Sequence, residues 1–136
     1  MDKKRILSKL DELNQYLSEL KEIKTSSIDE YINSIEKKRA CERLIQISIE
    51  TVIDICNILV SGLKLGLPFD EEDIFIKLEN KKLISKETSK MLREMKGFRN
   101  ILVHNYGDVD DELVFKMISK KLGDFDKFRK EVLKNI

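Results

Sequence analysis

Arg99, His104 and Tyr106 stand close together in the segment Arg-Asn-Ile-Leu-Val-His-Asn-Tyr, and their side chains suit phosphate chemistry. RNA carries its own nucleophile, the 2′-hydroxyl, so its cleavage requires only proton transfer and stabilisation of charge on the phosphate. A histidine can exchange protons near neutral pH, and an arginine can bind two phosphate oxygens at once. A tyrosine can stack on a base or donate a hydrogen bond to phosphate. The three residues therefore indicate metal-independent RNA cleavage.

His104 is the only histidine in the chain, and a single histidine is more often structural than catalytic. Its position close to Arg99, Asn100 and Tyr106 favours a role in a site. The sequence offers no obvious carboxylate cluster for a metal, so neither a metal nor a cofactor is expected. The alternative is a helical dimerisation module without a site, in which this grouping is a coincidence.

Regular helix geometry does not bring all three side chains together. At about 100° per residue, Arg99 and Tyr106 lie within about 20° of each other, whereas His104 points about 140° away from Arg99. Two arrangements could complete the site. Either the last helical turn before Gly107 unwinds, or two copies of the chain face each other across a two-fold axis.

Composition predicts an all-α protein. The chain has 136 residues, of which 41% are hydrophobic and 38% charged, with one proline and five glycines. We expect a single domain over residues 1–136, built from about five helices that include two long antiparallel ones. The net charge of +1 gives no broad positive field for nucleic acid. Short basic runs, such as Lys37-Lys38-Arg39 and Lys120-Lys121, are either local RNA contacts or solvated helix faces.

Apolar spacing and capping residues predict the helix boundaries. Asp2 caps a helix that fades near residue 25. Ser27 and Glu30 form a capping box for a long helix that bends near Lys38 and closes by Gly66. The remaining predicted helices are a short one over residues 70–78, one from Ser85 to Gly107, one over residues 110–121, and a last one capped by Asp124.

The second half of the long helix is apolar over most of its circumference, with a narrow polar strip that includes Asp54 and Asn57. Because a small helical domain rarely covers such a helix by itself, we expect a subunit interface along it. Glu50, Asp54 and Lys64 argue against a membrane span.

Cys41 and Cys56 match neither zinc nor redox spacing, which indicates two buried thiols in a reducing cytosol. The N-terminal residues lack the apolar run of a signal peptide. The sequence therefore predicts a cytoplasmic protein without a membrane association.

The stretch from Gly97 to Tyr106 resembles the R-x-x-x-x-H-x-Y signature of HEPN ribonucleases, in the version found in HepT-like toxins. The segments Glu42–Glu50 and Val52–Asn57 look like the second long helix of that family, and Asp108-Val109-Asp110 after the signature also fits. The resemblance covers nearly the whole chain. One departure is Asn105, which stands where the family often has an aspartate, so the site has one charge fewer near His104.

The resemblance implies a HEPN-type helical bundle that forms a homodimer, with Arg99 and His104 as catalytic residues in a cleft between the subunits. It also implies a toxin that cleaves RNA and a minimal nucleotidyltransferase antitoxin that neutralises it by adding AMP to Tyr106. Asn100, Asp54 and Asn57 are expected to support the cleft. The alternative within the family is a chain that keeps the fold and the partner but cleaves little RNA.

Overall fold

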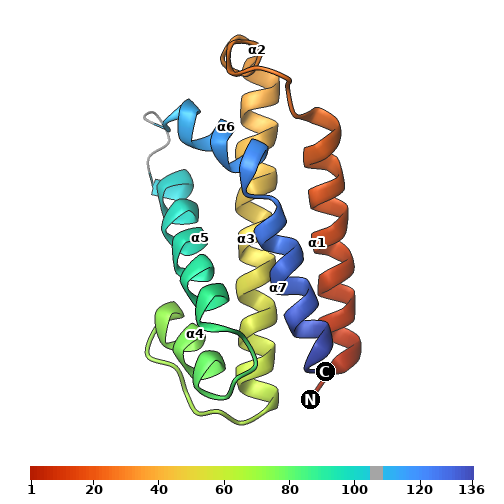
Figure 1. The fold of residues 1–136 in the computed structure, drawn as a ribbon, viewed down its shortest axis with the longest axis vertical. Helices are drawn as coiled ribbons and strands as arrows, with labels where there is room; N and C mark the ends of the chain where they lie inside the picture. Colours follow the sequence, from red (N-terminus) through yellow and green to blue (C-terminus); the bar gives the residue numbers. More distant parts are fainter. Residues whose placement is uncertain (105–108) are drawn as a thin grey trace.

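The computed structural model describes residues 1–104 and 109–136, and these residues form seven α-helices (Figure 1). The all-α fold class is confirmed, but the expectation of about five helices is wrong. The helices are α1 (Lys3–Ile23), α2 (Ile28–Ile32), α3 (Ile35–Gly62), α4 (Glu71–Asn80), α5 (Lys86–His104), α6 (Asp111–Lys120) and α7 (Gly123–Lys134).

The two longest helices, α1 and α3, run antiparallel, and α3 lies at the centre of the bundle (Figure 1). Helix α5 lies along one edge of the bundle, and α4 packs on its lower half. Helices α6 and α7 return the chain to the end where it began, so the two termini lie close together. One hydrophobic core contains side chains from all seven helices.

Most helix starts follow from local caps. A side-chain oxygen just before the helix accepts a hydrogen bond from a first-turn amide that has no partner within the helix. The side chains that accept in this way include Asp2 from the amide of Arg5 (3.0 Å), Asp70 from Asp73 (2.8 Å), Ser85 from Thr88 (3.1 Å) and Asp110 from Glu112 (2.9 Å).

The long helix expected from Ile28 is two helices rather than one that bends near Lys38. Ser27 caps α2 as predicted, but the carboxylate of Glu30 accepts from Ser26 and not from Ser27, so the capping box is half formed. The helix is interrupted before α3 because the hydroxyl of Ser34 accepts a hydrogen bond from the amide of Lys37, the third residue of α3, at 3.3 Å. A second cap thus competes successfully with helix continuation.

Two other helix ends differ from the expectation. Helix α3 ends at Gly62, and the residues that follow turn through positive φ angles at Lys64 (54°) and Gly66 (102°). Asp124 does not cap α7, because the helix already begins at Gly123 and the amides of Asp124 and Phe125 donate to the backbone carbonyls of Lys121 and Leu122. Asp124 lies in the first turn, where its charge still favours the positive end of the helix dipole.

Helix α3 has the length and hydropathy of a membrane span, with a mean hydropathy of 1.6 over 18 residues. Its apolar side chains are nevertheless buried inside the bundle by α1, α4, α5 and α6 of the same chain, and α1 makes the most extensive contact. It is therefore the core helix of the bundle. One chain thus buries much of α3 by itself, and a subunit interface along this helix stays a prediction.

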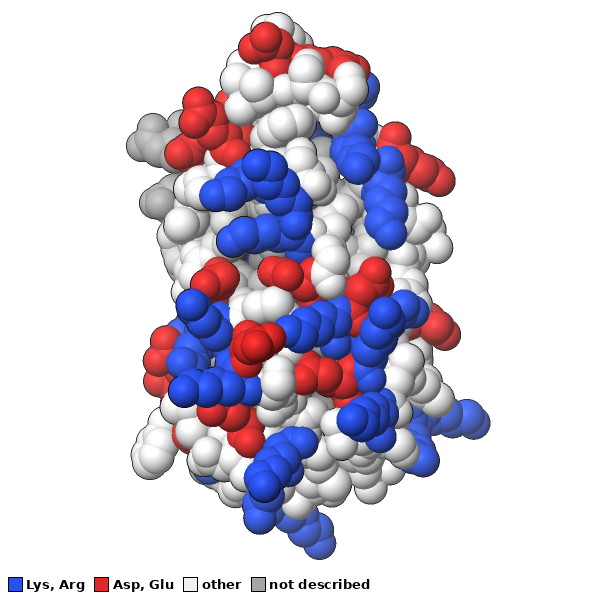
Figure 2. All heavy atoms as spheres, in the orientation of Figure 1, with Lys and Arg blue, Asp and Glu red and all other residues white. Residues whose placement is uncertain are grey.

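The surface carries both signs of charge. Figure 2 shows basic and acidic side chains interspersed over much of one face. The basic run at residues 37–39 is paired with acidic side chains: Lys37 with Glu30, Lys38 with Asp111 and Arg39 with Glu42. This run is therefore an ion-paired surface and not a free basic patch.

Candidate functional site

Helix α5 positions the residues of the Arg–His segment. It begins where Ser85 accepts the amide of Thr88, and its apolar side chains, including Leu92, Met95 and Leu102, pack into the core. This packing fixes the rotation of the helix about its axis, which in turn fixes the direction of every other side chain on it. Arg99 and His104 thus take their positions from the bundle.

Arg99 is held by two side chains. Its Nε donates to Oδ1 of Asn100 at 3.0 Å, and its Nη2 forms an ion pair with Oε1 of Glu71 in the first turn of α4. The Arg99 side chain is only 15% exposed, whereas that of Glu71 is 32% exposed. The guanidinium group is therefore fixed at the junction of α4 and α5, with limited access to solvent.

His104 is the last residue of α5 and is exposed. Because α5 is helical from Arg99 through His104, the two side chains leave the helix about 140° apart. Helix α5 does not unwind between Arg99 and His104, and the rest of the last turn before Gly107 lies outside the described residues. Within one chain, Arg99 and His104 do not converge on a common point.

Tyr106 and Asn105, which belong to the same sequence segment, lie outside the described residues. The assignment of Tyr106 as a site residue and modification target therefore stays a prediction from the sequence.

Asp54 and Asn57 lie on α3 and are exposed. Asp54 pairs with Lys9 of α1 at 3.6 Å, and the amide nitrogen of Asn57 donates to the carbonyl of Ile53 at 3.2 Å. Among residues 1–104 and 109–136, no hydrogen bond or ion pair joins either residue to Arg99 or His104. Of the three supporting residues predicted, only Asn100 contacts Arg99.

Glu71 is the contact that sequence reasoning missed. The chain there reads Asp70-Glu71-Glu72-Asp73, and its pattern identifies a capped helix start. Nothing in that pattern distinguishes Glu71 from its acidic neighbours, because its pairing with Arg99 depends on the packing of α4 against α5.

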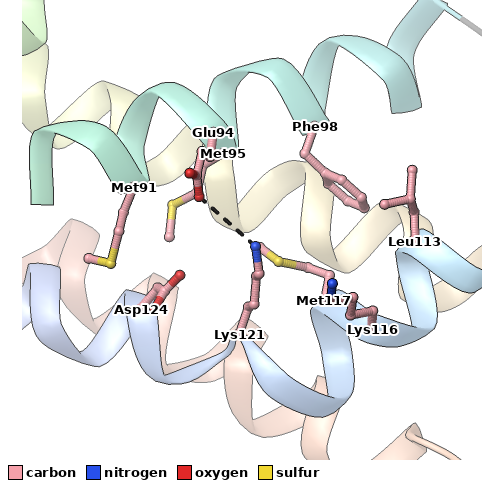
Figure 3. Close-up of a pocket in the computed structure, with 9 residues that line it drawn as sticks. All are labelled: Met91, Glu94, Met95, Phe98, Leu113, Lys116, Met117, Lys121 and Asp124. Carbon is pink, nitrogen blue, oxygen red and sulfur yellow. Dashed lines mark ion pairs between the residues drawn. The ribbon is translucent and has the colours of Figure 1, made fainter. Parts of the chain in front are cut away.

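A cavity of about 100 Å³ lies between α5, α6 and α7 (Figure 3). Its walls are mainly apolar and include Met91, Met95, Phe98 and Met117, while an ion pair between Lys121 and Glu94 (3.9 Å) crosses its rim. Phe98 precedes Arg99 in sequence but points into this cavity. The cavity is a gap in the packing, with neither Arg99 nor His104 in its lining.

The cysteine thiols do not offer a nucleophile. Cys41 and Cys56 are both free and buried. Burial raises the pKa of Cys41 to about 11, with a smaller contribution from the Glu42 charge, and burial also raises the pKa of Cys56. Since the thiolate is the reactive form, both side chains stay unreactive near neutral pH. In the described part of the chain, no three His, Cys, Asp or Glu side chains are grouped as metal ligands.

Comparison with known proteins identifies the family of this chain. The family model described as "Ribonuclease HepT-like" matches residues 13–132. A tRNA nuclease HepT from Aphanizomenon flos-aquae is 32% identical over 127 residues, which cover 93% of this chain and 86% of that protein. An mRNA nuclease HepT from Shewanella oneidensis is 35% identical over 79 residues, or 58% of this chain and 59% of that protein.

Solved structures give the same result at the level of the fold. A tri-AMPylated HEPN toxin of Shewanella oneidensis, in complex with its MNT antitoxin, has a TM-score of 0.87 and 25% identity. The match covers 96% of this chain and 97% of that one. The HEPN-type bundle expected from the sequence is thereby confirmed, and the chain belongs to the HepT-like ribonuclease family.

Proposed function

We propose that this chain is the toxin of a toxin–antitoxin pair and a metal-independent endoribonuclease that acts as a single domain over residues 1–136. The observation that carries the proposal is the position of Arg99 and an exposed His104 at the carboxyl end of α5, in a chain of the HepT-like family. Relatives named as tRNA and mRNA nucleases support RNA as the substrate.

The proposed reaction uses the 2′-hydroxyl of RNA as the nucleophile. His104 exchanges a proton with the reacting oxygens, and Arg99 binds the phosphate oxygens as negative charge develops on them. The 2′-oxygen bonds to phosphorus, the 5′-oxygen of the next nucleotide leaves with a proton, and a cyclic phosphate remains. The fixed guanidinium of Arg99 is suited to this role because its orientation is set before the substrate binds.

A homodimer completes the proposed site, because Arg99 and His104 of one chain point in different directions. Gly97, Ile101 and His104 follow one another at helical spacing along a solvent-exposed face of α5. Glycine within a helix costs about 1 kcal/mol relative to alanine. A Cβ at Gly97 would meet nothing within 4 Å in the described chain, so no neighbour in the same subunit requires a glycine there. The proposed dimer accounts for this glycine, because a residue without a side chain lets a second α5 approach closely.

The proposed partner is a minimal nucleotidyltransferase antitoxin, which transfers AMP from ATP to the hydroxyl of Tyr106 and releases pyrophosphate. The bulky anion would then repel RNA phosphates from the cleft. Support comes from the tri-AMPylated HEPN toxin in complex with MNT antitoxin. Both RNA and ATP are abundant in the cytoplasm, where we place the pair.

Cleavage of cellular RNA by the purified chain tests the proposal. Wild-type protein is expected to cleave the RNA pool in the presence of EDTA, and His104→Ala is expected to reduce the rate at least about 100-fold. Ser119→Ala, at an exposed position on α6, serves as the control and should cleave like wild type. Equal cleavage by His104→Ala and wild type would contradict the proposal, provided that circular dichroism shows both proteins folded.

A further inference from the structure

Three ion pairs join α4 to α5. Glu71 pairs with Arg99, Glu72 lies 4.0 Å from Lys96, and Glu79 lies 3.5 Å from Arg93. Since the residue numbers rise along α4 as they fall along α5, the two helices run antiparallel. Of these three contacts, only the one from Glu71 reaches a residue of the proposed site.

The geometry of the Arg99 guanidinium shows which of its N–H groups remain for a substrate. Nε is bonded to Oδ1 of Asn100, and Nη2 is bonded to Oε1 of Glu71. Nη1 has no hydrogen-bond partner among residues 1–104 and 109–136. Within these residues, both N–H groups of Nη1 and one N–H group of Nη2 therefore remain as donors.

We propose that Glu71 is a positioning residue for Arg99, which it holds so that Nη1 points toward the phosphate of bound RNA; this inference rests on the proposed function. An arginine side chain loses rotamer entropy when it is ordered. In this chain Glu71 and Asn100 impose that order before RNA arrives. The entropy of the Arg99 side chain is then lost when the protein folds, and its loss does not add to the free energy of reaching the transition state.

Two other roles for Glu71 give different results. If the carboxylate competes with phosphate for Arg99, removing Glu71 will raise cleavage and lower KM. If Glu71 only joins α4 to α5, removing it will lower stability without changing the turnover of the folded protein.

Kinetics of three variants separate these roles. In Glu71→Ala, we expect kcat to fall about 10-fold with KM within about threefold, because the contact is needed mainly as charge develops on the phosphate. In Glu71→Gln, the amide oxygen still accepts from Nη2, so we expect kcat within about threefold of wild type. Both substitutions remove one negative charge.

Glu72→Ala is the matched control. It removes the same charge from the same helical turn and breaks an α4–α5 ion pair, but it leaves Arg99 untouched. We expect wild-type kcat in this variant. A Glu71→Ala protein with unchanged or raised kcat would overturn the proposal, as would an equal loss of kcat in Glu71→Ala and Glu72→Ala.

A second measurement does not depend on cleavage. The Arg99 Nε–H signal in a ¹⁵N–¹H NMR spectrum can be assigned by its loss in Arg99→Lys. We expect slow exchange of this proton with solvent in wild type and Glu72→Ala, and at least about 10-fold faster exchange in Glu71→Ala. Equal exchange in all three would overturn the positioning role. A wild type without RNA cleavage would overturn the proposed function instead, and the exchange result would still decide whether Glu71 orders Arg99.

Discussion

Arg99 and His104 lie five residues apart on an unbroken helix, and their side chains leave it about 140° apart. Arg99 points toward the junction of α4 and α5, where Glu71 and Asn100 hold it, whereas His104 is exposed. The proposed homodimer would bring Arg99 of one chain and His104 of the other to the same phosphate.

Gly97→Leu should disrupt the proposed dimer. A Cβ at this position meets nothing within 4 Å in the described residues, and a leucine side chain would hold a second α5 away. We expect a monomer by size-exclusion chromatography with light scattering, loss of RNA cleavage, and an unchanged helical circular dichroism spectrum. Gly123→Leu is the matched control, because a Cβ at this helical glycine also meets nothing within 4 Å. If Gly97→Leu remains dimeric and active, the α5 face is not the interface.

Tyr106→Phe should prevent modification by the antitoxin. Incubation of the chain with its nucleotidyltransferase and ATP is expected to add the mass of AMP, and RNA cleavage should fall as the mass appears. Tyr16→Phe, on α1, serves as the control and should still gain the mass. Modification of Tyr106→Phe to the same extent as wild type would show that AMP is attached elsewhere.

Glu131→Ala should destabilise the start of α5. The Glu131 carboxylate, on α7, accepts from the backbone amide of Ser85 at 2.9 Å and from the hydroxyl of Thr88, which is buried. Without this carboxylate, the Ser85 amide and the Thr88 hydroxyl lose a charged hydrogen-bond acceptor. We expect the free energy of unfolding in urea to fall by about 1–3 kcal/mol. Lys130→Ala, at the exposed neighbouring position, should change it by less than about 0.5 kcal/mol. Equal values for the two variants would contradict this account of α5.

Cys41 should make stability fall at alkaline pH. Burial raises the pKa of its thiol from 9.0 to about 11, so between these pH values the folded chain keeps a proton that the unfolded chain has lost. The stabilisation is complete below pH 9 and is lost as pH rises toward 11. We therefore expect the free energy of unfolding to fall across this range, and to fall less steeply in Cys41→Ala. Identical slopes would contradict the raised pKa.

Much of the bundle could be predicted from sequence because its signals are local. Asp2, Asp70 and Ser85 cap helices through contacts with amides only three residues away. The break before α3 was missed because a second local cap, at Ser34, competes with an uninterrupted apolar pattern. The extent to which one chain covers α3 could not be predicted, because it depends on how several helices pack around it.

The candidate site also combines local features, which the sequence predicts, with a long-range contact, which it does not. The spacing of Arg99 and His104, and the contact of Arg99 with Asn100, follow from one short segment. Glu71 lies 28 residues before Arg99 in the chain, and only the antiparallel packing of α4 and α5 brings it there. Sequence spacing carries no signal for such a contact.

Mixing two inactive variants tests the central claim most directly. If Arg99 of one chain acts with His104 of the other, a heterodimer of Arg99→Ala and His104→Ala contains one intact site and one doubly substituted site. Equal amounts with free subunit exchange form half heterodimers, so the mixture should regain about a quarter of wild-type RNA cleavage. Native mass spectrometry can verify that heterodimers have formed. A mixture that contains heterodimers but cleaves no more RNA than either variant alone would contradict a site shared between two chains.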